Sequence, residues 1–430
     1  MSIDYQQLRL DGIYQMNQQN DLMLRVKIPA GVLSSEQAEK ISEIGERFGK
    51  GMLHLTSRAS IEFHWLRYEQ LEQIMPMLAA VGLTSRGACG GAVRGISCST
   101  SFGPGFEKIQ ALARGLQRHF AGNPYFEGLP KKFKLAVEAG YAGARHLIQD
   151  LALVYSGDRD GAPRFDVWCA GGLGREPQPA FCYARNLEEQ TLLPLIEAVI
   201  AVYAEGAPAG KRLKHLVNEI GEADFRKQVE KRHQSTPPPR LRPSVAGPLV
   251  VTPEALITLP IFAGELRSEQ LRNLAQLAKL YCGGFLALNT DQDILLPLAD
   301  PDQSSVLQEA LTQLGLIDGE PLLSCRLCPG NHECRMGLVA TRDLARELNE
   351  RLAGGPLANA GFAISGCPNS CSQPQLADYG IVTRKLVKAE DGRRTPRFDL
   401  LKRSGVTFGE PLATELSRES LFLALNDLNR

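Results

Sequence analysis

One segment of the chain occurs twice. Residues 31–65 align without a gap with residues 264–298, and the Ser-Glu-Gln triplet at 35–37 recurs at 268–270. In each copy an apolar strand leads through glycine to a capped amphipathic helix, and a glycine turn, further strand and a second helix follow. Self-similarity of this kind indicates a duplicated fold. We therefore expect an α+β protein with two small ferredoxin-like half-domains related by a pseudo-twofold axis.

The two copies divide the chain into segments. Segment 231–248 is rich in proline and basic residues, which is typical of an exposed linker. On either side of it we expect a half-domain followed by a larger lobe. The predicted half-domains are 1–83 and 249–316, and the predicted lobes are 84–230 and 317–430.

Composition and charge exclude some classes of partner. The chain has 430 residues and a formal net charge of zero at neutral pH, so nothing in the bulk charge indicates a nucleic acid or an acidic membrane surface. The N-terminus has no apolar segment behind a basic start, and no stretch approaches the ~20 apolar residues of a membrane span. We expect a soluble, cytoplasmic protein without a nucleic-acid or membrane partner.

The ten cysteines fall into two groups. Because cytosolic thiols stay reduced, a disulfide framework is not expected, and crowded thiols indicate metal ligation. Half of the thiols are crowded between residues 325 and 371. The others are scattered, and we interpret them as small buried apolar residues: Cys89, Cys98, Cys169, Cys182 and Cys282.

The crowded thiols have the spacing of cluster ligands. Cys328 and Cys334 form C-x5-C, and Cys367 and Cys371 form C-x3-C. Four thiolates from two loops suit a 4Fe–4S cluster. A zinc site that uses Cys325 in C-x2-C with Cys328 is the alternative. A zinc ribbon usually repeats the C-x2-C spacing, however, and the second pair here does not.

The C-x5-C pair followed by ISGCPNSC resembles the signature of the siroheme-dependent nitrite and sulfite reductases. The repeat, the linker and further motifs extend the resemblance over nearly the whole chain. It implies the duplicated nitrite/sulfite reductase fold, with two ferredoxin-like half-domains and two lobes that hold siroheme and a 4Fe–4S cluster. It also implies that Cys371 bridges the cluster to the siroheme iron, with Cys328, Cys334 and Cys367 as the other cluster ligands.

The same resemblance implies a cationic site. Siroheme carries eight carboxylates and the substrate is itself an anion, so a buried site for both must be lined with arginine and lysine. The matching motifs are T-x-R, GGAVRGISC and K-x-K, and the catalytic residues that they imply are Arg58, Arg94, Lys132 and Lys134. Arginine offers bidentate donors to an oxyanion, whereas lysine offers point charges and protons.

The alignment of the repeats locates this site. Arg58 aligns with Asp291, and Arg94 aligns with Leu327, which precedes Cys328. If the fold is pseudo-symmetric, one copy presents the cations and the other presents the cluster, so we expect the active site between the two halves.

Further positions resemble the siroheme contacts of the family. A glycine turn ends at Arg175, and a basic stretch covers 211–214; an ordinary loop and a solvated helix face are the alternatives. The resemblance implies these siroheme-binding residues: Arg175, Lys211, Arg212, Lys214, Gln292 and Asn369. The chain departs from the family pattern at Ala59, Ser372 and Gln373.

The resemblance implies a six-electron reduction of sulfite to sulfide, with reduction of nitrite to ammonia as the alternative. Nitrite enzymes of the family tend to carry asparagine at the position of Lys134. Because sulfite carries more charge than nitrite, a lysine there favours sulfite. A precorrin-3B synthase-like enzyme that modifies a tetrapyrrole ring is a second alternative, and a siroheme-binding subunit without its own activity is a third.

The electron donor is expected to be a separate protein. No GxGxxG follows a predicted strand, so the sequence indicates neither a NAD nor a flavin domain. We therefore expect an external donor, a ferredoxin or a flavoprotein subunit, to supply the electrons for the oxyanion substrate.

Overall fold

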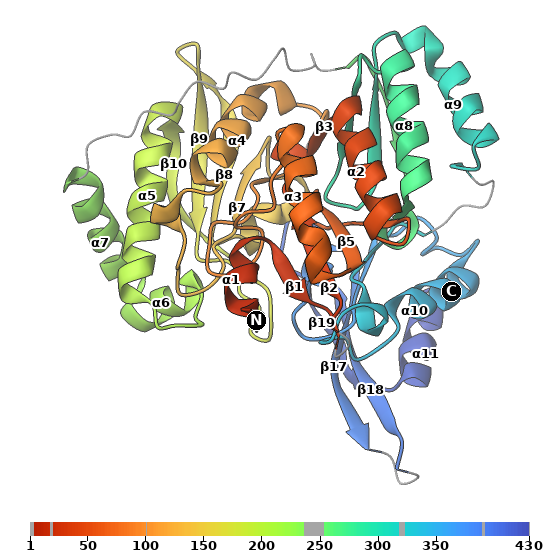
Figure 1. Cartoon of the computed structure of the whole chain (residues 1–430). Coiled ribbons are helices and arrows are strands. Elements are labelled where there is room, and N and C mark those ends of the chain that lie inside the picture. The colour runs from red at the N-terminus through yellow and green to blue at the C-terminus, as the bar shows by residue number, and fades with distance from the viewer. Residues whose placement is uncertain are drawn as a thin grey trace.

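Both copies of the repeat form the predicted unit in the computed structural model, which describes residues 4–17, 20–99, 101–235, 253–317, 323–388 and 392–429 (Figure 1). The first copy consists of β2 (Leu22–Val26), β3 (Val32–Ser34), α2 (Ser35–Phe48), β4 (Met52–Leu55), β5 (Ile61–Leu66) and α3 (Leu71–Ala80). The second consists of β11 (Ala255–Leu259), β12 (Glu265–Arg267), α8 (Ser268–Tyr281), β13 (Phe285–Leu288), β14 (Ile294–Leu298) and α9 (Ser304–Gln313). The expected pair of ferredoxin-like half-domains is therefore confirmed.

The Ser-Glu-Gln triplet begins a helix in both copies, as the sequence predicts. At α2 the Ser34 hydroxyl accepts from the backbone N–H of Gln37, and the Gln37 side chain accepts from the N–H of Ser34. At α8 the Gln270 side chain accepts from the N–H of Arg267. These contacts satisfy N–H groups at the helix start that have no partner inside the helix.

The half-domains exchange edge strands. Strand β12 pairs with β4, and β3 pairs with β13, so the sheet orders are β1-β2-β5-β4-β12 and β11-β14-β13-β3, where β1 is Ile13–Gln15. Two symmetric bonds accompany the exchange, from Ser35 N to Gly284 O and from Ser268 N to Gly51 O, each 2.8 Å. Helices α2 and α8 pack against each other. The two halves therefore share one core instead of forming independent domains.

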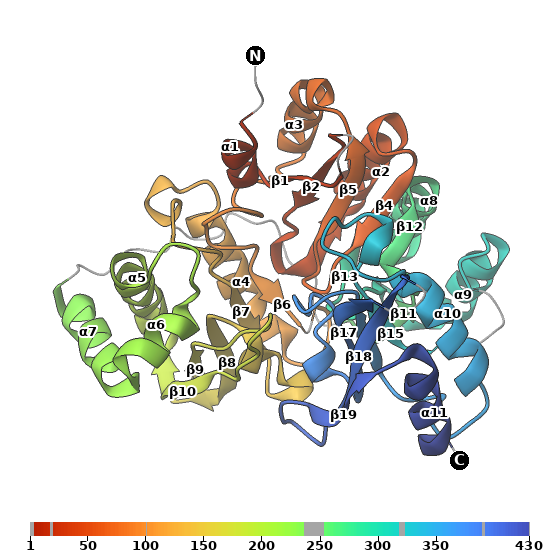
Figure 2. The same ribbon diagram turned by 90° about the horizontal axis from the view of Figure 1, so that it is seen from below.

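The duplication extends to the lobes, which occupy different sides of the molecule (Figure 2). The first lobe has the sheet order β10-β9-β8-β7-β6, and the second has β15-β16-β17-β18-β19; in each, three parallel strands are followed by two antiparallel ones. The first comprises β6 (Ser97–Cys98), α4 (Phe106–Phe120), β7 (Leu135–Glu138), β8 (Leu151–Arg159), β9 (Ala162–Cys169), β10 (Phe181–Glu188), α5 (Glu189–Gly206), α6 (Leu213–Ile220) and α7 (Glu222–Ser235). The second comprises β15 (Cys325–Leu327), α10 (Thr341–Leu352), β16 (Phe362–Ser365), β17 (Tyr379–Lys388), β18 (Arg394–Lys402), β19 (Glu410–Leu416) and α11 (Arg418–Leu428).

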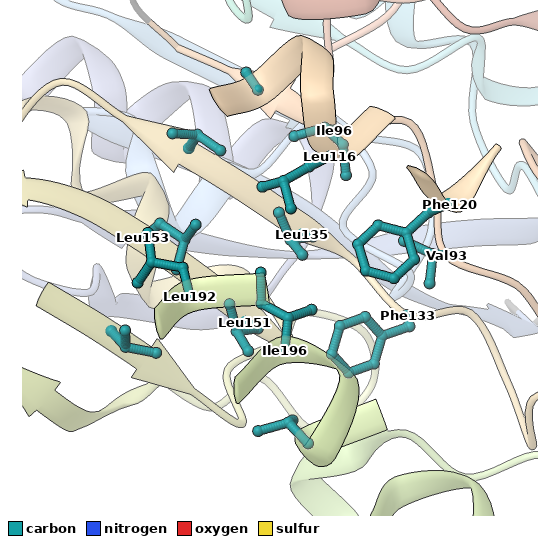
Figure 3. Packing of buried hydrophobic residues seen from close by; sticks show 14 of the residues in the cluster. Val93, Ile96, Leu116, Phe120, Phe133, Leu135, Leu151, Leu153, Leu192 and Ile196 are labelled. Atoms are coloured by element: carbon teal, nitrogen blue, oxygen red, sulfur yellow. The ribbon is translucent and has the colours of Figure 1, made fainter. Parts of the chain in front are cut away.

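The core of the first lobe fixes the segment that precedes β7. Leu116 and Phe120 of α4 and Ile196 of α5 pack with Phe133 and Leu135 (Figure 3). Since side chains alternate along an extended chain, burial of Phe133 turns its two neighbours, both lysines, to the opposite side.

The predicted linker begins inside a helix. Helix α7 continues to Ser235, so residues 231–235 are helical, and residues 236–248 lie outside the described residues. Among the described residues, no helix is both long and apolar enough to span a membrane.

Candidate active site

A cavity of about 340 Å³ lies where the first half-domain meets residues of both lobes. One part of its wall consists of cations from the N-terminal half: Arg25, Lys27, Arg58, Arg94, Lys132 and Lys134. Another part consists of thiols from the C-terminal half: Cys328, Cys334, Cys367 and Cys371. The structure thus brings together the cations of one copy and the thiols of the other.

Burial and like charges dominate the electrostatics of the cationic wall. Burial, with Arg212 and Arg94 nearby, lowers the pKa of Lys132 to about 8 despite the opposing effect of Cys371. Burial, with Arg58 and Lys132 nearby, lowers the pKa of Lys134 well below its ordinary value. An anion that enters the cavity would stabilise the charged forms of these lysines, so the wall is suited to an anionic ligand.

Arg58 is committed to acceptors within the protein. Its guanidinium donates to Gln149 Oε1 at 2.8 Å, to the Gly95 carbonyl at 2.9 Å and to the Leu135 carbonyl at 3.1 Å. The Arg94 guanidinium by contrast makes a single long contact among the described residues, a donation to the Gly87 carbonyl at 3.3 Å. Arg58 therefore fixes the junction between half-domain and lobe and adds charge to the cavity, whereas Arg94 keeps more donors for a ligand.

Arg25 and Lys27 were not among the predicted site residues. Arg25 lies within β2 and Lys27 directly after it, on the face opposite to Leu24 and Val26, and both line the cavity. A cation at every second position of an otherwise apolar strand was the available signal. The sequence interpretation treated LMLRVKIP only as a strand of the repeat.

Arg25 faces a carboxylate that also lines the cavity. Its Nε donates to Glu62 Oε1 at 2.8 Å, and His64 Nε2 donates to Glu62 Oε2 at 3.1 Å. Although burial disfavours its charged form, Arg25 and His64 hold the pKa of Glu62 well below its usual range. Glu62 therefore cancels part of the positive charge of the wall.

Because of Lys27, we expect the free energy of unfolding of the cofactor-free protein to rise with pH above neutrality. It is 2% exposed, and burial together with Arg94 lowers its pKa to about 7. The unfolded chain keeps this proton up to about pH 10.4. Between these values the unfolded state binds more protons, so the free energy of unfolding rises with pH, by up to about 1.4 kcal/mol per unit.

We predict that Lys27→Met reduces the rise of the free energy of unfolding with pH. In urea unfolding of the cofactor-free protein at pH 7 and pH 8, wild type should gain stability relative to the variant as the pH rises. Parallel pH dependences of wild type and variant would show that Lys27 is charged in the folded state at both values.

The thiols converge because of the sheet topology. Strands β15 and β16 are parallel, Cys328 follows the first and Cys367 lies just beyond the second. The carboxyl ends of neighbouring parallel strands lie at the same edge of a sheet. Burial raises the pKa of Cys328 to about 12 and that of Cys367 to about 11, so both thiols release protons when they bind a metal.

The surroundings of the thiols fit a cluster of several irons. The backbone N–H of Gly366 donates to Cys328 Sγ at 3.1 Å, a contact that stabilises a thiolate. In the described ranges of the chain, no three His, Cys, Asp or Glu side chains are spaced to hold a single metal ion. Cys325 does not line the cavity and packs against the apolar core of the second lobe. The zinc alternative, which pairs Cys325 with Cys328, would therefore need a thiol that does not border this cavity.

A second cavity of about 410 Å³ adjoins the first. Lys132, Lys134 and Asn369 line both cavities, so the two spaces share part of their wall. Lys131 also lines the second cavity. Its remaining lysines and arginines come from the glycine turn and from the start of α6, and they are the predicted siroheme contacts Arg175, Lys211, Arg212 and Lys214. A wall of this charge fits a ligand with many carboxylates.

These cations differ in how firmly the protein holds them. Arg212 binds Asp150 through two bonds, of 3.1 Å and 2.7 Å, and Asp150 is fully buried. Lys214 donates to the carbonyl of Glu176, and burial with Arg212 nearby lowers the pKa of Lys214 to about 8. Arg175 and Lys211 are exposed. Arg212 is therefore preorganised, whereas the exposed pair is free to adjust to a ligand.

The side chain of Gln292, a predicted siroheme contact, bonds to two other parts of the protein. Its amide donates to the Leu55 carbonyl at 2.7 Å and its carbonyl accepts from the N–H of Leu327 at 2.7 Å. It is 1% exposed and borders the first cavity. Gln292 thus joins the first half-domain to the strand that precedes Cys328, and both ends of its side chain already have partners.

Two family profiles match the chain. "Nitrite/Sulfite reductase ferredoxin-like half domain" matches residues 14–81 and 252–314, which are the two copies of the repeat. "Nitrite and sulphite reductase 4Fe-4S domain" matches residues 95–236, the first lobe.

Known proteins of both substrate types resemble the chain over most of its length. Ferredoxin–nitrite reductase of Synechococcus elongatus is 28% identical over 93% of this chain and 84% of its own. Sulfite reductase [ferredoxin] 2 of Mycolicibacterium paratuberculosis is 27% identical over 86% of this chain and 71% of its own.

Among solved structures, the NirA protein of Mycobacterium tuberculosis superposes with a TM-score of 0.79 at 22% identity, over 97% of this chain and 85% of that one. Its fold is therefore the fold seen here. Together with the duplicated architecture, the thiols and the cationic cavities, these matches show that the chain belongs to the nitrite and sulfite reductase family, oxidoreductases that carry a 4Fe–4S cluster and siroheme.

Proposed function

We propose that this protein reduces sulfite to sulfide at a siroheme coupled to a 4Fe–4S cluster. The observation that carries the proposal is that Lys132 and Lys134 both line the cavity that the four thiols border. Burial of Phe133 turns the two lysines to the same side. The site therefore offers two lysines, beside Arg94, to an anion with two negative charges.

We assign different residues to the two cofactors, cysteines to the cluster and cations to the siroheme. Cys328, Cys334, Cys367 and Cys371 would hold the cluster, and Cys371 would be the thiolate nearest the siroheme. The cations of the second cavity bind the siroheme carboxylates, and Arg212 is held in place by Asp150. When bound, the cofactor pair supplies electrons to the sulfur atom.

The cationic wall binds the substrate and supplies protons. Arg94, Lys132 and Lys134 already line the cavity before the substrate arrives, so their charges can stabilise the anion. Each oxygen that leaves as water needs protons. Lys132, whose pKa is lowered to about 8 chiefly by burial, is suited to donate one near neutral pH and to take it back from solvent.

Nitrite is the second candidate substrate. Glu62 pairs with Arg25 in the wall of the cavity, which lowers the positive charge available to the anion and favours the anion of lower charge. Nitrite reductases and sulfite reductases are both similar to this chain. We give more weight to Lys134, because this half-buried lysine adds a second charge beside Lys132 in the wall of both cavities.

We further propose a ferredoxin as the electron donor. The similar nitrite and sulfite reductases are named as ferredoxin enzymes. A flavoprotein subunit is the alternative.

The test is steady-state reduction of both anions by the purified holoenzyme with reduced methyl viologen. We expect kcat/KM for sulfite to exceed that for nitrite by about tenfold or more, the effect of one charge-assisted contact. A preference for nitrite would overturn the sulfite assignment. Reduction of neither anion would favour a ring-modifying enzyme of the precorrin-3B synthase type.

A further inference from the structure

The turn that carries Cys371 has an unfavourable backbone. Between β16 and β17, Ser370 has φ 55° and Gln373 has φ 62°. Residues with a side chain rarely adopt this left-handed conformation. Contacts from outside the turn must therefore hold it, and those contacts determine where the Cys371 sulfur lies.

Hydrogen bonds from both halves of the protein hold this turn. Arg326 Nε donates to the Ser372 carbonyl at 3.1 Å, and its Nη2 donates to the Gln373 carbonyl at 3.3 Å. The Ser57 hydroxyl donates to the Cys371 carbonyl at 2.8 Å, and the Gln373 amide donates to the Ser57 carbonyl at 2.7 Å. Residues 371–373 are thus bonded to both halves of the protein.

Asp291 joins the two arginines that hold this turn. Its Oδ1 accepts from Arg326 Nη1 at 2.6 Å and from Arg145 Nη2 at 2.8 Å. Arg145 Nη1 donates to the Gln373 side-chain oxygen at 2.6 Å. The side chains of Arg145 and Arg326 are only 8% and 10% exposed, so without a shared carboxylate their charges would repel each other with little screening.

Asp291 is ionised, as its position between two arginines requires. Burial opposes ionisation, but Arg145 and Arg326 hold the pKa of Asp291 well below its usual range. The N–H of Asp291 also donates to Asn289 Oδ1 at 2.8 Å, which fixes the turn between β13 and β14. An ionised, anchored carboxylate therefore orients both guanidinium groups.

The repeat shows how the two copies have diverged here. Asp291 aligns with Arg58, and both lie in the turn between the last two strands of their half-domain. Arg58 borders the cationic cavity, whereas Asp291 contacts the arginines behind Cys371. The same turn thus serves the anion site in one copy and the thiol-bearing turn in the other.

We propose that Asp291 is a positioning residue that, through Arg145 and Arg326, fixes the turn of Cys371 and with it the coupling between siroheme and cluster. This inference rests on the proposed role of Cys371 as the shared ligand. The geometry of that ligand decides how well electrons reach the substrate, and misplacement by about 1 Å can lower a rate by about 100-fold.

The experiment compares Asp291→Ala with Asp293→Asn in the purified holoenzyme. Asp293 lies in the same turn, and its carboxylate accepts from Asn289 instead of from the two arginines. Iron and heme content, the magnetic coupling of heme and cluster by EPR and Mössbauer spectroscopy, and sulfite turnover are measured for each variant.

We expect Asp291→Ala to retain both cofactors, to lose the coupled signal in a large share of molecules, and to lower kcat by about 10- to 100-fold at a nearly unchanged KM. Asp293→Asn should match wild type. Wild-type coupling and turnover in a fully loaded Asp291→Ala variant would overturn the inference, as would an equal loss in Asp293→Asn. A wild-type protein without any heme–cluster coupling would instead overturn the proposed function.

If Asp291→Ala does not fold, Gln373→Asn replaces it. Asparagine tolerates the left-handed backbone but is one methylene shorter, so it cannot keep the contacts to Arg145 and Ser57. The same loss of coupling is expected, and its absence would overturn the inference.

Discussion

Replacement of Cys371 by serine is expected to lower sulfite reduction by more than about 100-fold, because a hydroxyl cannot act as the shared thiolate ligand between cluster and siroheme. Cys371 is the most exposed of the four thiols that border the first cavity, which leaves it open to a ligand on its far side. Cys328, Cys334 and Cys367 remain in this variant. We therefore expect it to keep part of its iron while losing the magnetic coupling between heme and cluster.

The matched control is Cys325→Ser. Cys325 lies in β15, away from the cavity, and packs in the core of the second lobe. This variant should keep both cofactors and most of the activity. If Cys325 proves necessary for the cluster and Cys328 does not, the assignment of thiols to the cluster is wrong by one residue.

Lys134→Asn is expected to lower kcat/KM for sulfite by about 10- to 100-fold, which corresponds to the loss of one charge-assisted contact in a buried site. Nitrite turnover should fall less, or rise, because nitrite carries one negative charge fewer. Lys134 differs from the other cations of the cavity in this respect, since Arg94 and Lys132 would serve either anion.

Lys131→Asn is the control for this substitution. Lys131 is a near neighbour that lines only the second cavity and is exposed. It should leave the ratio of sulfite to nitrite turnover unchanged. If Lys134→Asn spares sulfite turnover and abolishes nitrite turnover, nitrite is the better assignment.

The duplicated half-domains could be predicted from the sequence because the patterns that specify their helices and strands lie within short segments. The capping contacts of Ser34 and Gln37 and the alternation of apolar residues are both visible in short windows. The exchange of β3 and β12 between the half-domains was not predicted. Each is three residues long, and its pairing depends on residues more than 200 positions away, which no local pattern records.

The candidate site was predictable to the same degree. The spacing of four cysteines and a K-x-K pair that resembles the family motif indicated residues that border one cavity in the structure. Arg25 was not predicted because it lies within a strand that the sequence analysis interpreted only as an apolar element of the repeat. The role of Asp291 depends on Arg145 and Arg326, which come from different lobes. Only the three-dimensional arrangement brings these side chains together.

We expect this one chain to hold both a siroheme and a 4Fe–4S cluster. The direct measurement is the iron, zinc and heme content of the purified protein together with its optical spectrum, recorded with and without sulfite. We predict about four cluster irons and one heme iron per chain, with a heme spectrum that changes when sulfite binds. Stoichiometric zinc without heme absorption would contradict the account.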